Sequence, residues 1–193
     1  MRQLVYFVAV SLDGKIGGPD GSFDFFPVDA GYLGELNEDW GDGLPTAFHR
    51  ATGLEPPGTK WDTVVMGRNT FQPAIDAGIS SPYEHLDQYV FSSSLDPAQH
   101  PDVHVVSGDP LAFVHSLKRQ PGGDIWLCGG GTIAATLAPE IDRLVLKLSP
   151  FVVGEGVPLF AGPFAPSHWR LTHQRTHDIG VVVLTYDRAE AGS

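Results

Sequence analysis

The segment IWLCGGGTIAATLA, residues 125–138, constrains the fold of this chain more than any other stretch. Four apolar residues, Ile125 to Cys128, precede three consecutive glycines, and an alanine-rich helical pattern follows Thr132. Three glycines in a row carry a conformational-entropy penalty on folding, because glycine is the most flexible residue in the unfolded chain. The pattern predicts a strand that passes directly into a helix, with a bare backbone at the junction.

Short apolar runs and helical patterns alternate along the rest of the chain. Asp109 and Pro110 suit the cap and the first position of a helix, and Pro73 is expected to interrupt a helical turn. Strands are predicted at residues 4–10, 61–67, 89–94, 103–108, 124–131, 143–151, 169–177 and 180–188. Helical segments are predicted at residues 68–75, 109–119 and 132–138, and a broken helical region is predicted at 29–53 with a second helix beginning near Pro45.

This alternation predicts an α/β fold of three layers, with a mostly parallel central sheet and helices on both faces. The last two strands have no helix between them, so we expect an antiparallel hairpin at the edge of the sheet. No repeat or linker composition marks a boundary, and we expect one domain over residues 1–193 with a frayed AEAGS tail. Ligands of such sheets bind beyond the carboxyl ends of the strands.

The charge balance narrows the class of partner. The net charge is −11, from 12 basic and 23 acidic residues, which disfavours nucleic acid and anionic membrane surfaces. No apolar run approaches the roughly 20 residues of a membrane helix, and the apolar N-terminus is interpreted as a strand rather than a signal peptide. The single cysteine, Cys128, excludes an intrachain disulfide framework. We therefore expect a cytoplasmic protein with a small-molecule ligand.

Three predicted strands end in small, glycine-rich or hydroxyl residues, in the segments VVMGRNTF, VFSSSL and WLCGGGTI. Free backbone N–H groups and the positive end of a helix dipole attract anions, and glycine lets a phosphate approach closely. The Arg68 guanidinium could hold a phosphate bidentately, and Ser92, Ser93 and Ser94 could bind a second one. Each site alone could equally be a tight turn, but three together favour NADP, although no G-x-G-x-x-G pattern is present.

Five segments, in order, resemble the dihydrofolate reductase superfamily, and most closely its bacterial branch that includes the reductase domain of the riboflavin-biosynthesis deaminase-reductase. They are AVSLDGKIG (9–17), VVMGRNTF (64–71), VFSSS (90–94), CGGGTIAATL (128–137) and LVLKLSPFVVGEGVPLF (144–160). The resemblance implies a dihydrofolate-reductase-like fold, NADPH bound across the sheet and a cis bond between Gly129 and Gly130. A homodimer is a further implication.

The resemblance also implies a role for particular residues in holding NADPH. Ala9, Ile16 and Gly17 would line the nicotinamide pocket. The phosphates, riboses and adenosine would contact Gly67, Arg68, Asn69, Thr70, Ser92, Ser93, Ser94, Gly129, Gly130, Gly131, Thr132 and Ile133.

The substrate side departs from the family pattern. Riboflavin-type reductases usually carry a lysine in the first strand and a glutamate before the glycines, where this chain has Phe7 and Cys128. True dihydrofolate reductases carry a carboxylate on the first helix. Four candidates occur in this chain without a clear alignment, namely Glu35, Glu38, Asp39 and Asp42.

Catalytic groups are not identified by the sequence. Asp13, Asp24 and Trp40 are weak candidates for the substrate wall, although Asp13 suits a turn and Trp40 suits core packing. His173 and His177 are four residues apart on a predicted strand, and neither a Cys/His cluster nor a hydrolase elbow is present, so no metal is expected.

The leading hypothesis is an NADPH-dependent oxidoreductase that transfers a hydride to a small, flat, pterin- or pyrimidine-like heterocycle. The resemblance allows an activity like that of 5-amino-6-(5-phosphoribosylamino)uracil reductase or of dihydrofolate reductase. The alternatives are a nucleotide-binding relative without catalysis and a variant that uses a flavin.

Overall fold

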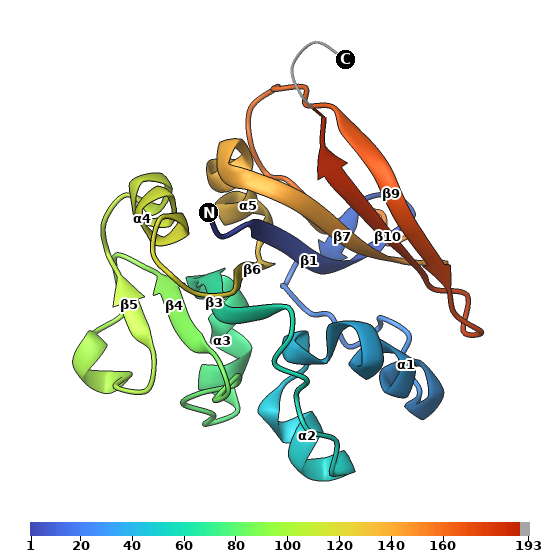
Figure 1. Cartoon of the computed structure of the whole chain (residues 1–193), viewed down its shortest axis with the longest axis horizontal. Helices are drawn as coiled ribbons and strands as arrows, with labels where there is room; N and C mark the ends of the chain where they lie inside the picture. The colour runs from blue at the N-terminus through green and yellow to red at the C-terminus, as the bar shows by residue number, and fades with distance from the viewer. Residues whose placement is uncertain (190–193) are drawn as a thin grey trace.

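An eight-stranded sheet forms the centre of the protein in a computed structural model that describes residues 1–189 (Figure 1). In spatial order its strands are β5 (His104–Val106), β4 (Asp87–Phe91), β3 (Trp61–Gly67), β6 (Asp124–Gly129), β1 (Leu4–Ser11), β7 (Ile141–Ser149), β10 (Val182–Arg188) and β9 (Trp169–Thr176). Every pairing from β5 to β7 is parallel, whereas β10 is antiparallel to both β7 and β9. The predicted parallel sheet and edge hairpin are both confirmed.

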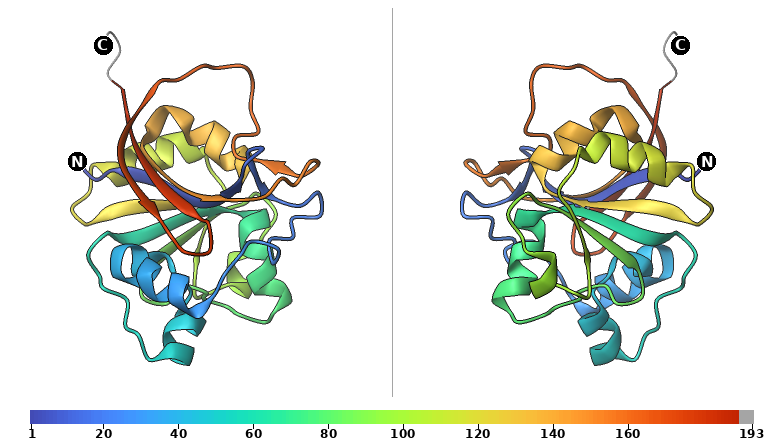
Figure 2. Two further views of the ribbon diagram at one scale, coloured as in Figure 1. Left: turned by 90° about the vertical axis from the view of Figure 1, so that its right-hand side faces the viewer. Right: turned by 90° about the vertical axis from the view of Figure 1, so that its left-hand side faces the viewer.

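Helices cover both faces of this sheet (Figure 2). On one face lie α4 (Pro110–Lys118) and α5 (Gly131–Leu137), and on the other lie α1 (Ala30–Trp40), α2 (Thr46–Thr52) and α3 (Arg68–Asp76). Short 3₁₀ turns occur at Gly41–Gly43, Pro97–Gln99 and Ala138–Glu140. No helix within residues 1–189 has both the length and the apolar character that crossing a bilayer requires.

Side-chain alternation along β1 divides the core into two layers. Leu4 and Tyr6 pack on the α4 and α5 side, whereas Val5 and Phe7 pack on the α1 and α3 side. All four are at most 3% exposed. Because a core layer lies on each side of the sheet, both faces of β1 are buried, which explains its continuous apolar sequence.

Two local predictions need correction. The helix that begins at Arg68 is not interrupted at Pro73, because α3 continues to Asp76. Pro73 removes one intrahelical hydrogen bond close to the first turn, and the fully buried Phe71 holds the helix on the sheet. The strand predicted at 89–94 also ends early, at Phe91.

A second, two-stranded sheet was not predicted. It pairs β2 (Lys15–Gly17) with β8 (Val157–Pro158), and neither strand is long enough to show a periodicity. Asp13 ties the same two segments together, since its carboxylate accepts hydrogen bonds from the backbone N–H groups of Val153 and Gly154 at 3.0 and 2.7 Å. Of the predicted frayed tail, residues 190–193 lie outside the described residues.

Candidate functional site

Two cavities open where the parallel strands end, and they meet beside Gly130 of the glycine segment. The first has a volume of about 700 Å³ and the second about 450 Å³. Ile16, Thr70 and Gly130 line both cavities. A ligand that fills the first cavity therefore reaches the second one at these three residues, at the carboxyl edge expected for this class of sheet.

The first cavity contains most of the residues that the sequence assigns to NADPH. The beginnings of α3 and α5 both face it, so their free N–H groups point toward a common space. Among the predicted residues, its walls contain Ile16, Gly17, Gly67, Arg68, Asn69, Thr70, Gly130, Gly131, Thr132 and Ile133.

Different structural features require glycine at positions 129 and 131. Gly129 has a φ of 142°, which side chains rarely allow, and the Gly129–Gly130 peptide bond is cis as the resemblance implies. A Cβ atom on Gly131 would lie 2.2 Å from the carbonyl oxygen of Pro158. The Gly131 carbonyl also accepts a hydrogen bond from Ala161 at 2.9 Å. The bare backbone therefore allows the segment around β8 to pack against α5.

Of the residues predicted to bind the adenosine end and its 2′-phosphate, only some line the first cavity. Arg68 is exposed, lines the first cavity and forms no ion pair with any residue from 1 to 189, so its guanidinium is available to a phosphate. Phe91 also lines the cavity, but Ser92, Ser93 and Ser94 follow it beyond the cavity wall. The Ser92 hydroxyl accepts hydrogen bonds from the N–H groups of Ser94 and Leu95, which holds the turn after β4.

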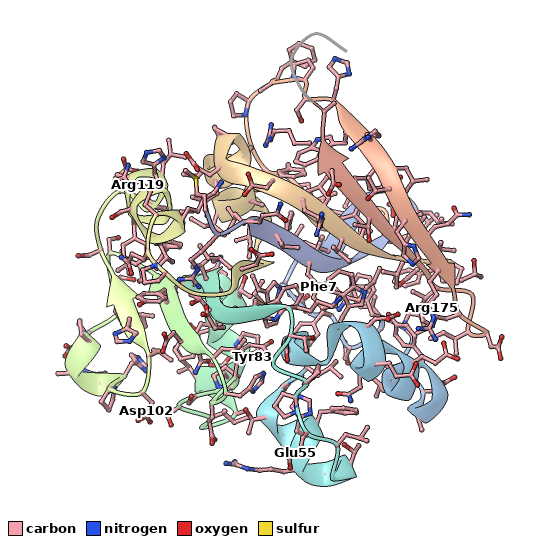
Figure 3. The ribbon with its side chains drawn as sticks, viewed as in Figure 1. Phe7, Glu55, Tyr83, Asp102, Arg119 and Arg175 are labelled. Carbon is pink, nitrogen blue, oxygen red and sulfur yellow. The ribbon has the colours of Figure 1, made fainter. Side chains whose placement is uncertain are left out.

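The second cavity is mainly aromatic and aliphatic. Ala9 and Ile16, which the resemblance assigns to the nicotinamide, lie in its wall, and so does Gly129, which the resemblance assigns to the pyrophosphate. Its aromatic lining residues are Phe7, Phe23, Phe26, Tyr32, Tyr83 and Trp126. Figure 3 shows that Phe7 and Tyr83 lie toward the centre of the molecule, whereas Arg175 lies near α1 at the outer edge. Such a cavity favours a flat ring over a highly charged ligand.

The two departures from the family pattern, Phe7 and Cys128, both line this second cavity. The Lys147 ammonium of β7 lies 4.2 Å from the centroid of the Phe7 ring. Burial lowers the pKa of Lys147 to about 8. Burial raises the pKa of Cys128 to about 11, and its Sγ lies 3.9 Å from the Tyr83 hydroxyl. At neutral pH the cavity thus contains an ammonium beside an un-ionised thiol and an un-ionised phenol.

The three weak catalytic candidates lie in different environments. Asp24 lines the second cavity at an exposed position. Asp13 lines neither cavity, and hydrogen bonds from Ser11 and from the backbone near β8 lower its pKa to about 2, so it acts as a structural tie. Trp40 also lines neither cavity and stacks on Phe7 and Trp61 at centroid distances of 5.5 and 5.7 Å.

None of the four candidate carboxylates near the first helix lines the second cavity. Glu35 hydrogen-bonds to His177, and Glu35, Glu38 and Asp39 lie within 3.7 Å of Arg175. The fully buried Asp42 accepts backbone hydrogen bonds from Gly58, Thr59 and Lys60 at 2.6, 2.9 and 2.8 Å. These carboxylates therefore hold α1 to the hairpin and hold the following loop in place.

Sequence reasoning missed Lys147 and Tyr83. A signal existed for Lys147, because it interrupts the apolar sequence of β7 between Leu146 and Leu148. Tyr83 lies in an irregular loop, where no periodicity could place it near Cys128. Within the part of the chain that the structure describes, no group of three or more His, Cys, Asp or Glu side chains is arranged to hold a metal.

The sheet order and the paired cavities define a dihydrofolate-reductase-like α/β protein. The fold is similar to that of Enterococcus faecalis dihydrofolate reductase, which was solved with NADP(H), with a TM-score of 0.63, 18% identity and 97% of each chain covered. This likeness establishes the architecture.

The chain belongs to the RibD C-terminal domain family, which it matches over residues 2–183. It is 33% identical over 161 residues to the Bacillus subtilis protein YwjB, covering 82% of this chain and 83% of that protein. A solved structure from Shewanella sp. PV-4, assigned to riboflavin biosynthesis, is similar with a TM-score of 0.70 and 25% identity. That match covers 98% of this chain and 100% of the other.

We predict that Gly131→Ala lowers the melting temperature. The added methyl group would overlap the Pro158 carbonyl and displace the segment that packs on α5, at a cost of roughly 1–3 kcal/mol. Gly67→Ala is the matched control, since its Cβ would lie 3.5 Å from the Ile133 side chain, an ordinary contact. Thermal unfolding followed by circular dichroism compares the variants, and equal melting temperatures would contradict this packing argument.

Proposed function

We propose that this protein is an NADPH-dependent reductase that transfers a hydride to a small, flat, pterin- or pyrimidine-like heterocycle. The observation that carries the proposal is the meeting of the two cavities at Ile16, Thr70 and Gly130. One cavity has the backbone amides and the arginine that suit a dinucleotide, and the other has the aromatic walls that suit a flat ring. NADPH, when bound, would supply the hydride.

The residues of the first cavity would hold the cofactor in an extended form. The N–H groups after Gly130 would bind the pyrophosphate, while Asn69 and Thr70 at the start of α3 would contact phosphate and ribose. Arg68 would recognise the 2′-phosphate with its planar fork of donors. Ser92 to Ser94 would meet the adenosine end only if the nucleotide extends past Phe91.

The substrate is proposed at the level of a heterocycle class. A true dihydrofolate reductase is disfavoured, because the carboxylates of α1 pair with Arg175 and His177 instead of lining the cavity. Phe7 and Cys128 in turn weigh against the 5-amino-6-(5-phosphoribosylamino)uracil reductase activity. A binding module without catalysis remains the second candidate, motivated by the same two residues. A cytoplasmic location and a homodimer remain predictions from the sequence.

The first test is a calorimetric titration of NADPH and NADH, followed by assays of NADPH oxidation with pterin, pyrimidine and quinazoline acceptors. We expect saturable binding with a preference for NADPH, and oxidation with at least one acceptor. Absence of NADPH binding would refute the cofactor assignment. Binding without oxidation of any acceptor would favour the non-catalytic alternative, and a flavin spectrum in the purified protein would favour the flavin-using variant.

Arg68→Ala should weaken NADPH binding by roughly tenfold or more and should weaken NADH binding much less, because a charge-assisted contact to the 2′-phosphate is lost. Arg119→Ala is the control, since Arg119 is also exposed but lies at the end of α4 and lines neither cavity. The dissociation constants of both nucleotides are measured for each variant. Equal weakening of NADPH and NADH would show that Arg68 does not read the 2′-phosphate.

A further inference from the structure

One ammonium group projects into the aromatic cavity. Lys147 lies opposite Ala9 of β1 in the parallel pairing of β1 with β7, and both residues line the second cavity. Its Nζ lies over the Phe7 ring, 4.2 Å from the centroid. The cavity lining contains no arginine or histidine and one carboxylate, Asp24, at an exposed position. Lys147 therefore supplies the positive charge of this cavity.

This ammonium has no carboxylate partner among residues 1–189. By contrast the ammonium of the buried Lys118 lies 3.2 Å from Glu140 and 2.8 Å from Asp142. An unpaired charge in an apolar cavity opposes folding, since neither water nor a counter-ion fully replaces its hydration. The depressed pKa of Lys147 has this same cause. A ligand that accepts a hydrogen bond would compensate the charge.

The titratable groups that line the cavity with Lys147 do not neutralise it. The Cys128 thiol of β6 and the Tyr83 phenol stay protonated, because burial raises the pKa of both. From α1, Tyr32 also has a pKa raised by burial. On the neighbouring strand β10, the residue opposite Lys147 is the apolar Val183. The cavity thus offers hydrogen-bond donors and one positive charge, which suits acceptor atoms on a ligand.

We propose that Lys147 determines the substrate specificity of the second cavity, by selecting flat heterocycles with a ring oxo group or oxyanion over their amino counterparts. This inference rests on the proposed function of the cavity as the substrate site. A ring laid along the aromatic walls places its edge against the ammonium, and an oxygen at that edge accepts a hydrogen bond. The same contact withdraws electron density from the ring, which favours hydride acceptance.

Two pteridines of one shape test the selection. Lumazine (pteridine-2,4-dione) and 2,4-diaminopteridine share a ring system and differ in their oxo and amino groups. Each is titrated by calorimetry at pH 7 with saturating NADP⁺, which cannot donate a hydride. We expect the wild-type protein to bind lumazine at least about tenfold more tightly than the diamino compound, and Lys147→Met to abolish that preference. Affinity for NADP⁺ should change by less than about twofold.

Lys60→Met is the matched control, because Lys60 lies 4.9 Å from the Trp40 ring centroid but is exposed and outside both cavities. It should keep the wild-type preference. Because Lys147 has a lower pKa in the folded than in the unfolded protein, its protonation opposes folding, with a penalty that grows as the pH falls below 10.5 and is fully present below about pH 8. Lys147→Met should therefore melt no lower than wild type at pH 7, and Lys147→Gln serves as a second variant if the methionine variant is misfolded.

Several results would overturn the inference. Equal binding of both pteridines to the wild-type protein, tighter binding of the diamino compound, or binding of neither would contradict it. So would a lumazine preference that survives in Lys147→Met. Failure of NADP⁺ to bind would instead contradict the proposed cofactor. In that case the pteridine titrations without nucleotide still test Lys147.

Discussion

Parallel pairing of β1 with both β6 and β7 is the constraint on which the site depends. Parallel strands end at the same edge of a sheet, so these three strands bring Gly129, Ala9 and Lys147 to one place. The residues come from chain positions far apart, and their meeting depends on a register that the buried faces of β1 strongly specify. The cofactor cavity then extends from this point toward β3 and β4, and the aromatic cavity extends toward α1.

The charge distribution separates the two halves of the site. Backbone amides and Arg68 make the first cavity suitable for an anion despite a net charge of −11. The second cavity contains an ammonium without an adjacent carboxylate, because the acidic residues of α1 are engaged by Arg175 and His177. The protein can therefore bind a phosphorylated cofactor locally, while the ligand of the aromatic cavity is expected to supply acceptor atoms.

The parallel sheet and the terminal hairpin could be predicted from the sequence, since apolar runs and helix caps are local patterns. Many residues of the first cavity were named through the resemblance to a known family, in addition to the glycine junctions. The aromatic cavity could not be predicted. Tyr83 approaches Cys128 from an irregular loop, and Lys147 of β7 approaches Phe7 of the adjacent strand β1. Both contacts therefore depend on tertiary packing. The continuation of α3 through Pro73 could not be predicted for a similar reason, because burial of Phe71 outweighs the local preference of proline.

A crystal structure of the protein with NADPH would test whether the two cavities form one cofactor and substrate site. We expect the pyrophosphate against the backbone of Gly130 to Thr132 and the nicotinamide ring at Ile16, Thr70 and Gly130, where the two cavities meet. The open side of the ring would then face Phe7 and Lys147. Electron density that places the nucleotide outside the first cavity, or directs the nicotinamide away from the aromatic cavity, would contradict this assignment of the two cavities.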